Sequence, residues 1–388
     1  MFGGVGTFSH NLAHALADSG ASVTVMAGWP RTEKNIEPVD KGVAGDNPQI
    51  VRVPVLGVPP RHLWYQISNL SAARELFSKC DIIHGQDAES FPMIAYCKRT
   101  RPKLPWVVTI HANPLLESYY ALRSMIALEG SLSEFLAHVV GFPFWDFPLR
   151  GDARYADAIV PVSESLSMEI QKYYRINPRK MFTIPTGVNI AHLEEIARTA
   201  RLHCVGDDTV KIFYAGRLYW RKGIVHLLKS LAYLVNKFQF SDFQLQVFGR
   251  GPLEQKIREL VSRLDLSDNV TIKGFVPYRQ LITSMAASDI VCFPSIYEAC
   301  PLGMIEAMIL ERPLVVFDKP FSRELLGHNS ELPLATSTED YSRCLYSLCT
   351  SKDLRKKIGT HLGAGAREKF DINAVAARYL KLYKNLLH

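Results

Sequence analysis

Short apolar runs rich in β-branched and aromatic residues alternate with amphipathic stretches in the second half of the chain. This alternation is typical of a parallel α/β sheet, whose strands are buried on both faces. The predicted strands are Lys211–Ala215, Gln244–Phe248, Val270–Lys273, Ile290–Phe293 and Leu314–Phe317. The predicted helices are Gly223–Phe238, Leu253–Leu264 and Pro301–Leu310. The pattern favours a doubly wound fold for this half.

The first half alternates less regularly. Its predicted strands are Val23–Ala27, Asp81–His84, Trp106–His111 and Ala158–Val162, and a helix is predicted over Phe8–Ser19. Residues 114–150 are aromatic and are interrupted by prolines, which favours a helical insertion packed on its own domain. The polar stretch that follows Ile184 and runs to Asp208 is the best candidate for an interdomain linker.

The length of 388 residues exceeds what one hydrophobic core usually serves, so we expect two domains, over residues 1–190 and 191–371. The glycine-rich stretch Gly3–Gly6 leads directly into a predicted helix, whereas such a turn normally follows a strand. We therefore expect the first strand of the N-terminal domain to be missing from this chain or to lie upstream of Met1.

Composition adds less. The first residues do not resemble a signal peptide, no membrane span is predicted, and the seven cysteines are scattered, which favours a reducing cytoplasm. The net charge of +7 is explained equally by a soluble basic surface and by attraction to phosphorylated substrates, anionic lipid or nucleic acid. No motif for binding nucleic acid accompanies this charge.

The segment after the strand Ile290–Phe293 carries two carboxylates. Glu298 lies in a turn, and Glu306 lies in a helix that begins near Pro301, where proline is favoured. The first backbone amides of this helix form an anion site suited to a diphosphate; they belong to Leu302, Gly303 and Met304. A phosphate repels carboxylates, so we expect Glu298 to bind sugar hydroxyls and Glu306 ribose hydroxyls. Taken singly, each is better explained as a solvated charge, and the surrounding residues make the combination specific.

Two cations follow the strand Lys211–Ala215. Arg217 and Lys222 project from the loop at the carboxyl edge of the sheet, along which ligands of open α/β sheets bind. Their planar fork and point charge both suit a diphosphate. Two basic loop residues in solvent explain the pattern as well.

Other candidates are less specific. Gly249 lies in a Gly-x-Gly turn, which more often means a plain turn than a ligand site. His111 and His84 each close a predicted strand, where a histidine faces a cleft or simply fills a core or caps a strand.

Several motifs occur in a characteristic order along nearly the whole chain. They are the glycine turn at Gly3 and Gly4, Asp81–His84, Ile110-His111, Pro161-Val162-Ser163, Ile184-Pro185 with Gly187-Val188, Gly216-Arg217 with Lys222-Gly223, Gly249 with Gly251-Pro252, and the pair Glu298 and Glu306. Together they resemble the retaining glycosyltransferases of family 4 (group 1), which have the GT-B fold. The resemblance implies two Rossmann-like, doubly wound domains facing each other across a cleft. Residues 1–190 would be the acceptor side, residues 191–371 the nucleotide-sugar-binding domain, and the last helix, 372–388, would cross back to the first domain.

The resemblance also implies roles for individual residues. Glu298 would contact the donor sugar and help hold the transition state, and Glu306 would bind the ribose. Arg217 and Lys222 would stabilise the leaving diphosphate, together with the amides of Leu302–Met304.

Three further positions take their expected roles from the same resemblance. His111 would line the acceptor side near the anomeric carbon, Gly4 would bring backbone close to the donor phosphates, and Gly249 would lie at the donor site. The family requires no divalent metal, and the chain has no Asp-x-Asp motif, so no metal and no cofactor are expected.

The chain departs from the family pattern at several positions. Thr186 stands where Asn is usual, Asn189 stands where Asp is usual, and Cys300-Pro301 replaces a more glycine-rich turn. The family often has Gly-Gly before the acidic residue at Glu324, whereas Phe321-Ser322-Arg323 intervene here.

The leading interpretation is a retaining transferase that moves a hexose from a UDP- or GDP-sugar to a saccharide or lipid-linked acceptor. It would be cytoplasmic, with the aromatic segment 114–150 as a candidate for binding an apolar acceptor or the inner membrane surface. A truncated or inactive homologue that binds nucleotide or a partner is the alternative, and an epimerase or phosphorylase on the same fold is a third.

Overall fold

The computed structural model describes residues 3–30, 47–55, 65, 69–87, 91–201, 209–327 and 332–388. The chain forms two compact units. The first consists of Met1–Leu115, Val140–Gly187 and Ile372–His388, and the second of Leu116–Val139 and Val188–Asp371.

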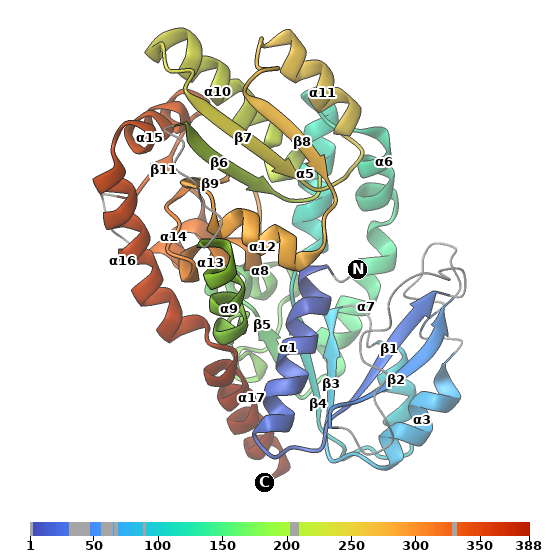
Figure 1. Cartoon of the computed structure of the whole chain (residues 1–388). Helices are drawn as coiled ribbons and strands as arrows, with labels where there is room; N and C mark the ends of the chain where they lie inside the picture. Colours follow the sequence, from blue (N-terminus) through green and yellow to red (C-terminus); the bar gives the residue numbers. More distant parts are fainter. Residues whose placement is uncertain are drawn as a thin grey trace. The chain divides into compact units, whose positions relative to one another are not determined.

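The second unit is built on a six-stranded parallel sheet (Figure 1). Its strands are β6 (Val210–Ala215), β7 (Phe243–Phe248), β8 (Val270–Gly274), β9 (Ile290–Phe293), β10 (Leu314–Phe317) and β11 (Leu334–Ala335). They are arranged in the order β11-β10-β9-β6-β7-β8. All four residues of β10 are buried, as expected of a strand covered by helices on both faces.

Helices and one short 3₁₀ turn surround this sheet. They are α9 (Ile190–Arg201), the 3₁₀ turn Trp220–Lys222, α10 (Ile224–Phe238), α11 (Glu254–Arg263), α12 (Tyr278–Ala286), α13 (Leu302–Ile309), α14 (Pro320–Leu326), α15 (Thr338–Thr350) and α16 (Lys352–Phe370). Their apolar faces and the strands form one continuous core that includes Leu228, Phe243 and Met304. This is the doubly wound arrangement that the apolar runs predicted.

The first unit contains two separate parallel sheets among its described residues. β1 (Thr24–Pro30) pairs with β2 (Gln49–Val55), and the other sheet has the order β3 (Ile83–Gln86), β4 (Trp106–Ile110), β5 (Ala158–Pro161). No described strand joins the two sheets. The Gly3–Gly6 stretch is the first turn of α1, which begins at Gly4.

The helices of the first unit include the first and the last described helices of the chain, which pack against each other. They are α1 (Gly4–Asp18), α3 (Leu70–Ser78), α4 (Met93–Cys97), the start of α5 (Pro114–Ile126), α7 (Phe142–Tyr155), α8 (Glu164–Tyr174) and α17 (Ile372–Leu387). The blue α1 and the dark red α17 lie side by side in Figure 1, with Phe8 against Tyr379 at a ring separation of 6.4 Å. The final helix thus belongs to the first unit.

Three expectations about organisation differ from this structure. Residues 114–150 do not pack as one insertion on the first domain, because 116–139, with α6 (Leu132–Phe135), group with the second unit. The expected linker Ile184–Asp208 instead contains α9, whose Leu193 and Ile196 enter the second unit's core, and residues 202–208 lie outside the described residues. The boundary near residue 190 differs from the division of the structure at 187/188.

Two glycines of α16 give a matched test of its packing. A Cβ on Gly359 would lie 2.1 Å from the backbone oxygen of Glu311, whereas a Cβ on Gly365 would meet nothing within 4 Å. We expect Gly359→Ala to destabilise the second unit by roughly 2 kcal/mol or more, because backbone must shift. Gly365→Ala should stabilise it by about 0.5–1 kcal/mol, since alanine is the better helix former. Calorimetric unfolding of both variants checks this, and similar midpoints for the two would contradict it.

Candidate functional site

The strand order of the second unit places a site at the carboxyl ends of β6 and β9. From β6 the chain adds strands in one direction as far as β8, and from β9 it adds them in the other direction as far as β11. Where the direction reverses, the two following loops separate and leave a crevice for ligands. Arg217 and Lys222 follow β6, and Glu298 follows β9.

The loops after β6 and β9 are held together by backbone. A Cβ on Gly223 would lie 1.8 Å from Pro294 O, and the φ of Gly223 is +73°, so glycine is required here. Ile296 N donates a hydrogen bond of 2.8 Å to Arg221 O. This close approach brings Lys222 beside Glu298.

Lys222 and Glu298 form an ion pair, as Nζ contacts Glu298 Oε1, and Ser295 Oγ donates to the same oxygen at 2.9 Å. The side chains are 20% and 9% exposed, so both charges are largely withdrawn from water. Burial lowers the pKa of Lys222, and the charge of Glu298 opposes this effect. A pair of this kind can exchange partners when a ligand supplies other charges or hydroxyls.

The N-terminus of α13 lies a few residues beyond Glu298. In the described part of the chain, the amides of Leu302 and Gly303 have no hydrogen-bond acceptor, as expected for the first turn of a helix. Met304 N donates to Pro301 O at 3.1 Å. The expected three-amide anion site therefore offers two free amides, because Met304 closes the first turn internally.

Glu306 lies inside α13 and is 5% exposed. Tyr278, at the start of α12, donates its hydroxyl to Glu306 Oε1 at 2.7 Å. Burial raises the pKa of Glu306, while the Tyr278 bond lowers it. A ribose hydroxyl at Glu306 would take the place of this phenol, since both donate to the same carboxylate.

Arg217 and Gly249 lie at the same edge of the sheet. Arg217 is exposed, and no hydrogen bond or ion pair of its side chain occurs among the described residues. Gly249 has a φ of +126°, and a Cβ there would lie 1.9 Å from Gly216 O. The packing of the two loops thus accounts for the glycine at 249 without any ligand.

The predicted site residues of the first unit lie in a different environment. His111 follows β4, its backbone N donates to Asp87 Oδ1 at 2.6 Å, and its Nε2 lies 2.8 Å from Gln86 Oε1. An amide oxygen only accepts, so Nε2 carries the proton, and Nδ1 is an acceptor with no hydrogen-bond partner among the described residues. Burial, with a smaller effect from His84, lowers the pKa of His111 to about 3.

His84 belongs to a buried polar chain that reaches α17. Its Nε2 lies 2.6 Å from Thr109 Oγ1, which lies 2.9 Å from the hydroxyl of Tyr379, and its Nδ1 lies 2.7 Å from the hydroxyl of Tyr383. Burial lowers the pKa of His84 to about 3. Both ring nitrogens of His84 thus have partners, Thr109 on β4 and Tyr383 on α17.

Gly4 is exposed at the first residue of α1. Gly3 precedes it as the N-cap, and Gly3 O accepts a hydrogen bond from Thr7 N at 3.0 Å. The expected role of Gly4 at donor phosphates remains a prediction.

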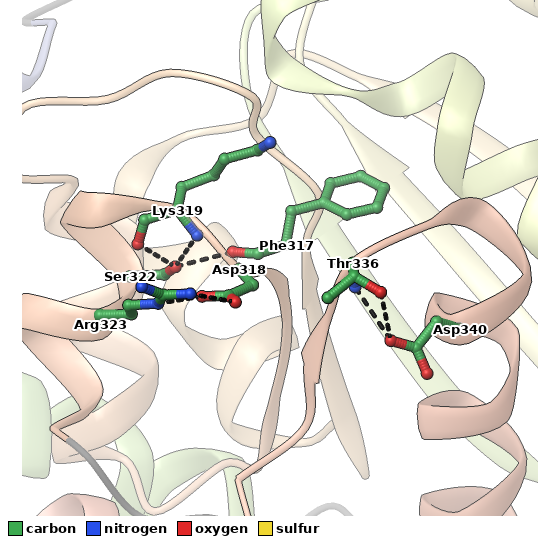
Figure 2. A network of polar contacts seen from close by, with 7 residues as sticks. All are labelled: Phe317, Asp318, Lys319, Ser322, Arg323, Thr336 and Asp340. Carbon is green, nitrogen blue, oxygen red and sulfur yellow. Dashed lines mark hydrogen bonds and ion pairs between the residues drawn. The ribbon is translucent and has the colours of Figure 1, made fainter.

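The start of α14, just after β10, is one of the places where the sequence departs from the family pattern. Ser322 is buried, lies 2.7 Å from Phe317 O, and accepts a bond of 2.9 Å from Lys319 N (Figure 2). Arg323 Nη2 donates to Asp318 Oδ2 at 2.6 Å, and its Nε donates to Oδ1. These polar groups satisfy one another, and Figure 2 shows the side chain of Lys319 extending away from them.

Within the described residues, no three histidine, cysteine or carboxylate side chains lie together as metal ligands. None of the described helices combines the length and apolar character that a membrane span requires.

Two family models together match most of the sequence. The model "Glycosyltransferase Family 4" matches residues 2–192, and the model "Glycosyl transferases group 1" matches residues 204–361. The chain belongs to the family 4 and group 1 glycosyltransferases. A curated relative, a D-inositol 3-phosphate glycosyltransferase of Pseudarthrobacter chlorophenolicus, is 24% identical over 81% of this chain and 73% of its own. In three further curated relatives the matched stretch spans only 47%, 65% and 44% of the relative's own length.

Solved structures show the fold of this family member. A sucrose-phosphate synthase from Thermosynechococcus elongatus superposes with a TM-score of 0.77 at 19% identity, covering 99% of this chain and 94% of its own. The Anabaena protein HepE, solved with UDP and glucose, gives a TM-score of 0.65 at 17% identity, with coverage of 87% and 86%. The GT-B assignment made from the motifs is thereby confirmed.

The motifs did not identify the residues that contact the predicted site residues or their neighbours. Arg221 binds Glu117, Tyr278 binds Glu306 and Gln86 binds His111. Of these supporting residues, only Gln86 had a signal in the sequence. It lies two residues beyond His84, the residue at which the predicted strand Asp81–His84 ends. The other contacts join residues far apart in sequence.

The buried histidines predict sensitivity to acid. His84 and His111 have lowered pKa values in the folded chain, so the unfolded chain binds more protons between pH 6.5 and about 3. Stability should be retained above pH 6.5 and fall as the pH drops, by up to about 1.4 kcal/mol per pH unit for each histidine. His84→Asn should reduce the drop in unfolding temperature between pH 7.5 and 5.0, measured by calorimetry. The exposed His361→Asn serves as control, and equal drops in both variants would contradict the expectation.

Proposed function

We propose that this chain is a retaining hexosyltransferase that transfers a hexose from a UDP- or GDP-sugar to a saccharide or lipid-linked saccharide without a divalent metal. The observation that carries the proposal is the Lys222–Glu298–Ser295 cluster at the reversal point of the sheet, beside the free amides of α13. It combines a cation and amides for a diphosphate with a carboxylate for sugar hydroxyls.

The donor would separate the ion pair. A diphosphate oxygen would replace Glu298 as the partner of Lys222, with Arg217 and the Leu302 and Gly303 amides as further donors. Glu298, no longer paired, would accept hydrogen bonds from the donor hexose. Each charge thereby exchanges one partner for another, so the buried groups stay satisfied throughout.

In the reaction, the bond between the anomeric carbon and the diphosphate oxygen breaks as an acceptor hydroxyl bonds to that carbon on the same face. The nucleoside diphosphate leaves with the electron pair, and Lys222 and Arg217 stabilise its developing charge. The acceptor proton departs with the leaving group. His111 is proposed to contact the sugar through its neutral imidazole, and Gly4 and Gly249 to lie near the donor.

The relatives support the donor class. HepE was solved with UDP and glucose, which favours a uridine nucleotide here. Exposed aromatic side chains of α7, Phe144, Trp145 and Phe147, support an apolar part of the acceptor or peripheral contact with a membrane. We propose a cytoplasmic location because the scattered cysteines favour a reducing compartment.

An inactive homologue that binds nucleotide without turnover is the second candidate. It is favoured by the separation of the first unit's described strands into two unjoined sheets. The two candidates differ in turnover but not in nucleotide binding.

The first experiment is a calorimetric titration with UDP, GDP and ADP, in EDTA, followed by assay of UDP or GDP release from nucleotide-sugars with saccharide acceptors. Binding of one nucleotide in EDTA, with turnover, is the expected outcome. Binding without turnover across donors and acceptors supports the inactive homologue. No binding of any nucleotide contradicts both candidates.

The two cations give a sharper prediction. Arg217→Ala and Lys222→Ala should each reduce turnover by roughly two to three orders of magnitude, because each removes a preorganised charge at the leaving group. Arg258→Ala is the control, since Arg258 forms an exposed ion pair with Glu254 in the same unit. Rates close to wild type in both site variants would contradict the assigned phosphate roles.

Replacing Glu298 by glutamine should affect nucleotide binding and turnover differently. Glu298→Gln removes the charge that competes for Lys222, so nucleoside diphosphate should bind as well as to wild type or more tightly. Transfer should fall, because the amide cannot stabilise positive charge on the sugar. Calorimetry and initial rates on the same preparation test the two halves, and weaker nucleotide binding would contradict the exchange of partners.

A further inference from the structure

Residues 116–139 form a helical segment that binds the loop after β6 through three carboxylates. Glu117 Oε1 lies 2.7 Å from Arg221 Nη2. Glu134 Oε2 accepts the backbone N–H of Trp220 at 3.2 Å, and Glu129 Oε2 accepts the indole N–H of the same residue at 2.8 Å. The segment comes from the first half of the sequence but belongs to the second unit.

These are buried contacts rather than surface ion pairs. Glu134 is 2% exposed, and the side chains of Arg221 and Glu117 are 12% and 19% exposed. Buried charges are costly unless paired, so each of these groups depends on its partner for stability in this position. His138 adds an imidazole neighbour, with Nδ1 3.7 Å from Glu117 Oε2, and burial lowers its pKa.

The segment also contacts the loop after β9. The ring of Tyr120 stacks on Tyr297, the residue before Glu298, at a centroid separation of 5.3 Å. Near the middle of the segment, Lys256 Nζ donates to Leu128 O at 2.7 Å. The segment is thus anchored to the unit independently of Arg221.

Arg221 connects these contacts to the proposed diphosphate site. It directly precedes Lys222, and its carbonyl accepts the hydrogen bond from Ile296 N. With its guanidinium held by Glu117 and its carbonyl held by Ile296, Arg221 has little freedom to rotate. The direction of the Lys222 side chain is set by the same stretch of backbone.

We propose that Glu117, acting through Arg221, is a positioning residue for the loop Arg217–Lys222, with Glu134 holding the loop's backbone at Trp220. The inference rests on the proposed function, because it assigns this loop to a donor diphosphate. The inference adds residues from the first half of the sequence to those that hold the proposed diphosphate site in place.

Charge and positioning predict opposite effects for Glu117. A carboxylate near a diphosphate repels it, so removing only the charge should tighten nucleotide binding. Loss of positioning should weaken binding, because Lys222 no longer meets the phosphate at the right place. The sign of the change therefore distinguishes a positioning residue from a mere neighbour.

The test is calorimetric titration with UDP and GDP of Glu117→Gln, Glu117→Asp, Arg221→Gln and the double variant Glu117→Gln/Arg221→Gln. We expect each single variant to weaken binding by roughly tenfold. Glu117→Asp keeps the charge and shortens the side chain, so a loss of nucleotide affinity in this variant reports the change in geometry alone. The double variant should bind no worse than the weaker single variant, since both act through one contact.

Glu194→Gln is the matched control, because Glu194 forms a more exposed pair with Arg367 in the same unit. It should leave nucleotide affinity unchanged. Unchanged or tighter binding in both Glu117 variants, or additive losses in the double variant, would overturn the proposal while leaving the proposed function intact. If wild type binds neither UDP nor GDP, the proposed function fails and this inference fails with it.

Discussion

The predicted donor site depends on one close approach of backbone, between Gly223 and Pro294. It is possible only for a residue without a Cβ, and it joins the loops after β6 and β9 where the sheet reverses its strand order. Lys222 and Glu298 meet because of this contact, and the N-terminus of α13 follows from the same β9 loop. A side chain at position 223 would separate the cation, the carboxylate and the helix amides together.

Charge balance then determines how the free site is stabilised. Arg221 and Lys222 are both largely buried, and Glu117, Glu298 and Glu134 surround them. Burial raises the pKa of Glu134, while the Trp220 amide and Arg221 oppose the effect. A diphosphate would add negative charge to a site already neutralised by carboxylates. In the proposed function Lys222 therefore exchanges partners, and the charge of the ligand would offset the cost of opening its ion pair.

The periodicity of apolar residues was sufficient to predict the strands and helices of the second unit. It was insufficient to predict the residues that hold the candidate site in place. Strands such as β10 are continuous apolar runs, so their pattern is local and legible. The β2 strand, Gln49–Val55, was missed because Arg52 and Pro54 interrupt its short apolar run, and α9 was taken for linker because its surface is polar. The attachment of residues 116–139 was unpredictable from pattern, since an ion pair such as Glu117–Arg221 joins positions that no periodicity relates. Site residues were identified by motif, whereas their partners required tertiary structure.

The two units also differ in the electrostatic character of their candidate residues. In the first unit, burial lowers the pKa values of His84 and His111 to about 3, so both imidazoles are neutral at physiological pH. In the second unit, Lys222 and Arg217 follow β6, and the N-terminus of α13 follows Glu298, the partner of Lys222. A neutral imidazole with a free acceptor suits a sugar hydroxyl, whereas cations and amides suit a diphosphate. This division of charge supports the proposal that the anionic part of the donor binds to the second unit and that His111 contacts an uncharged hydroxyl.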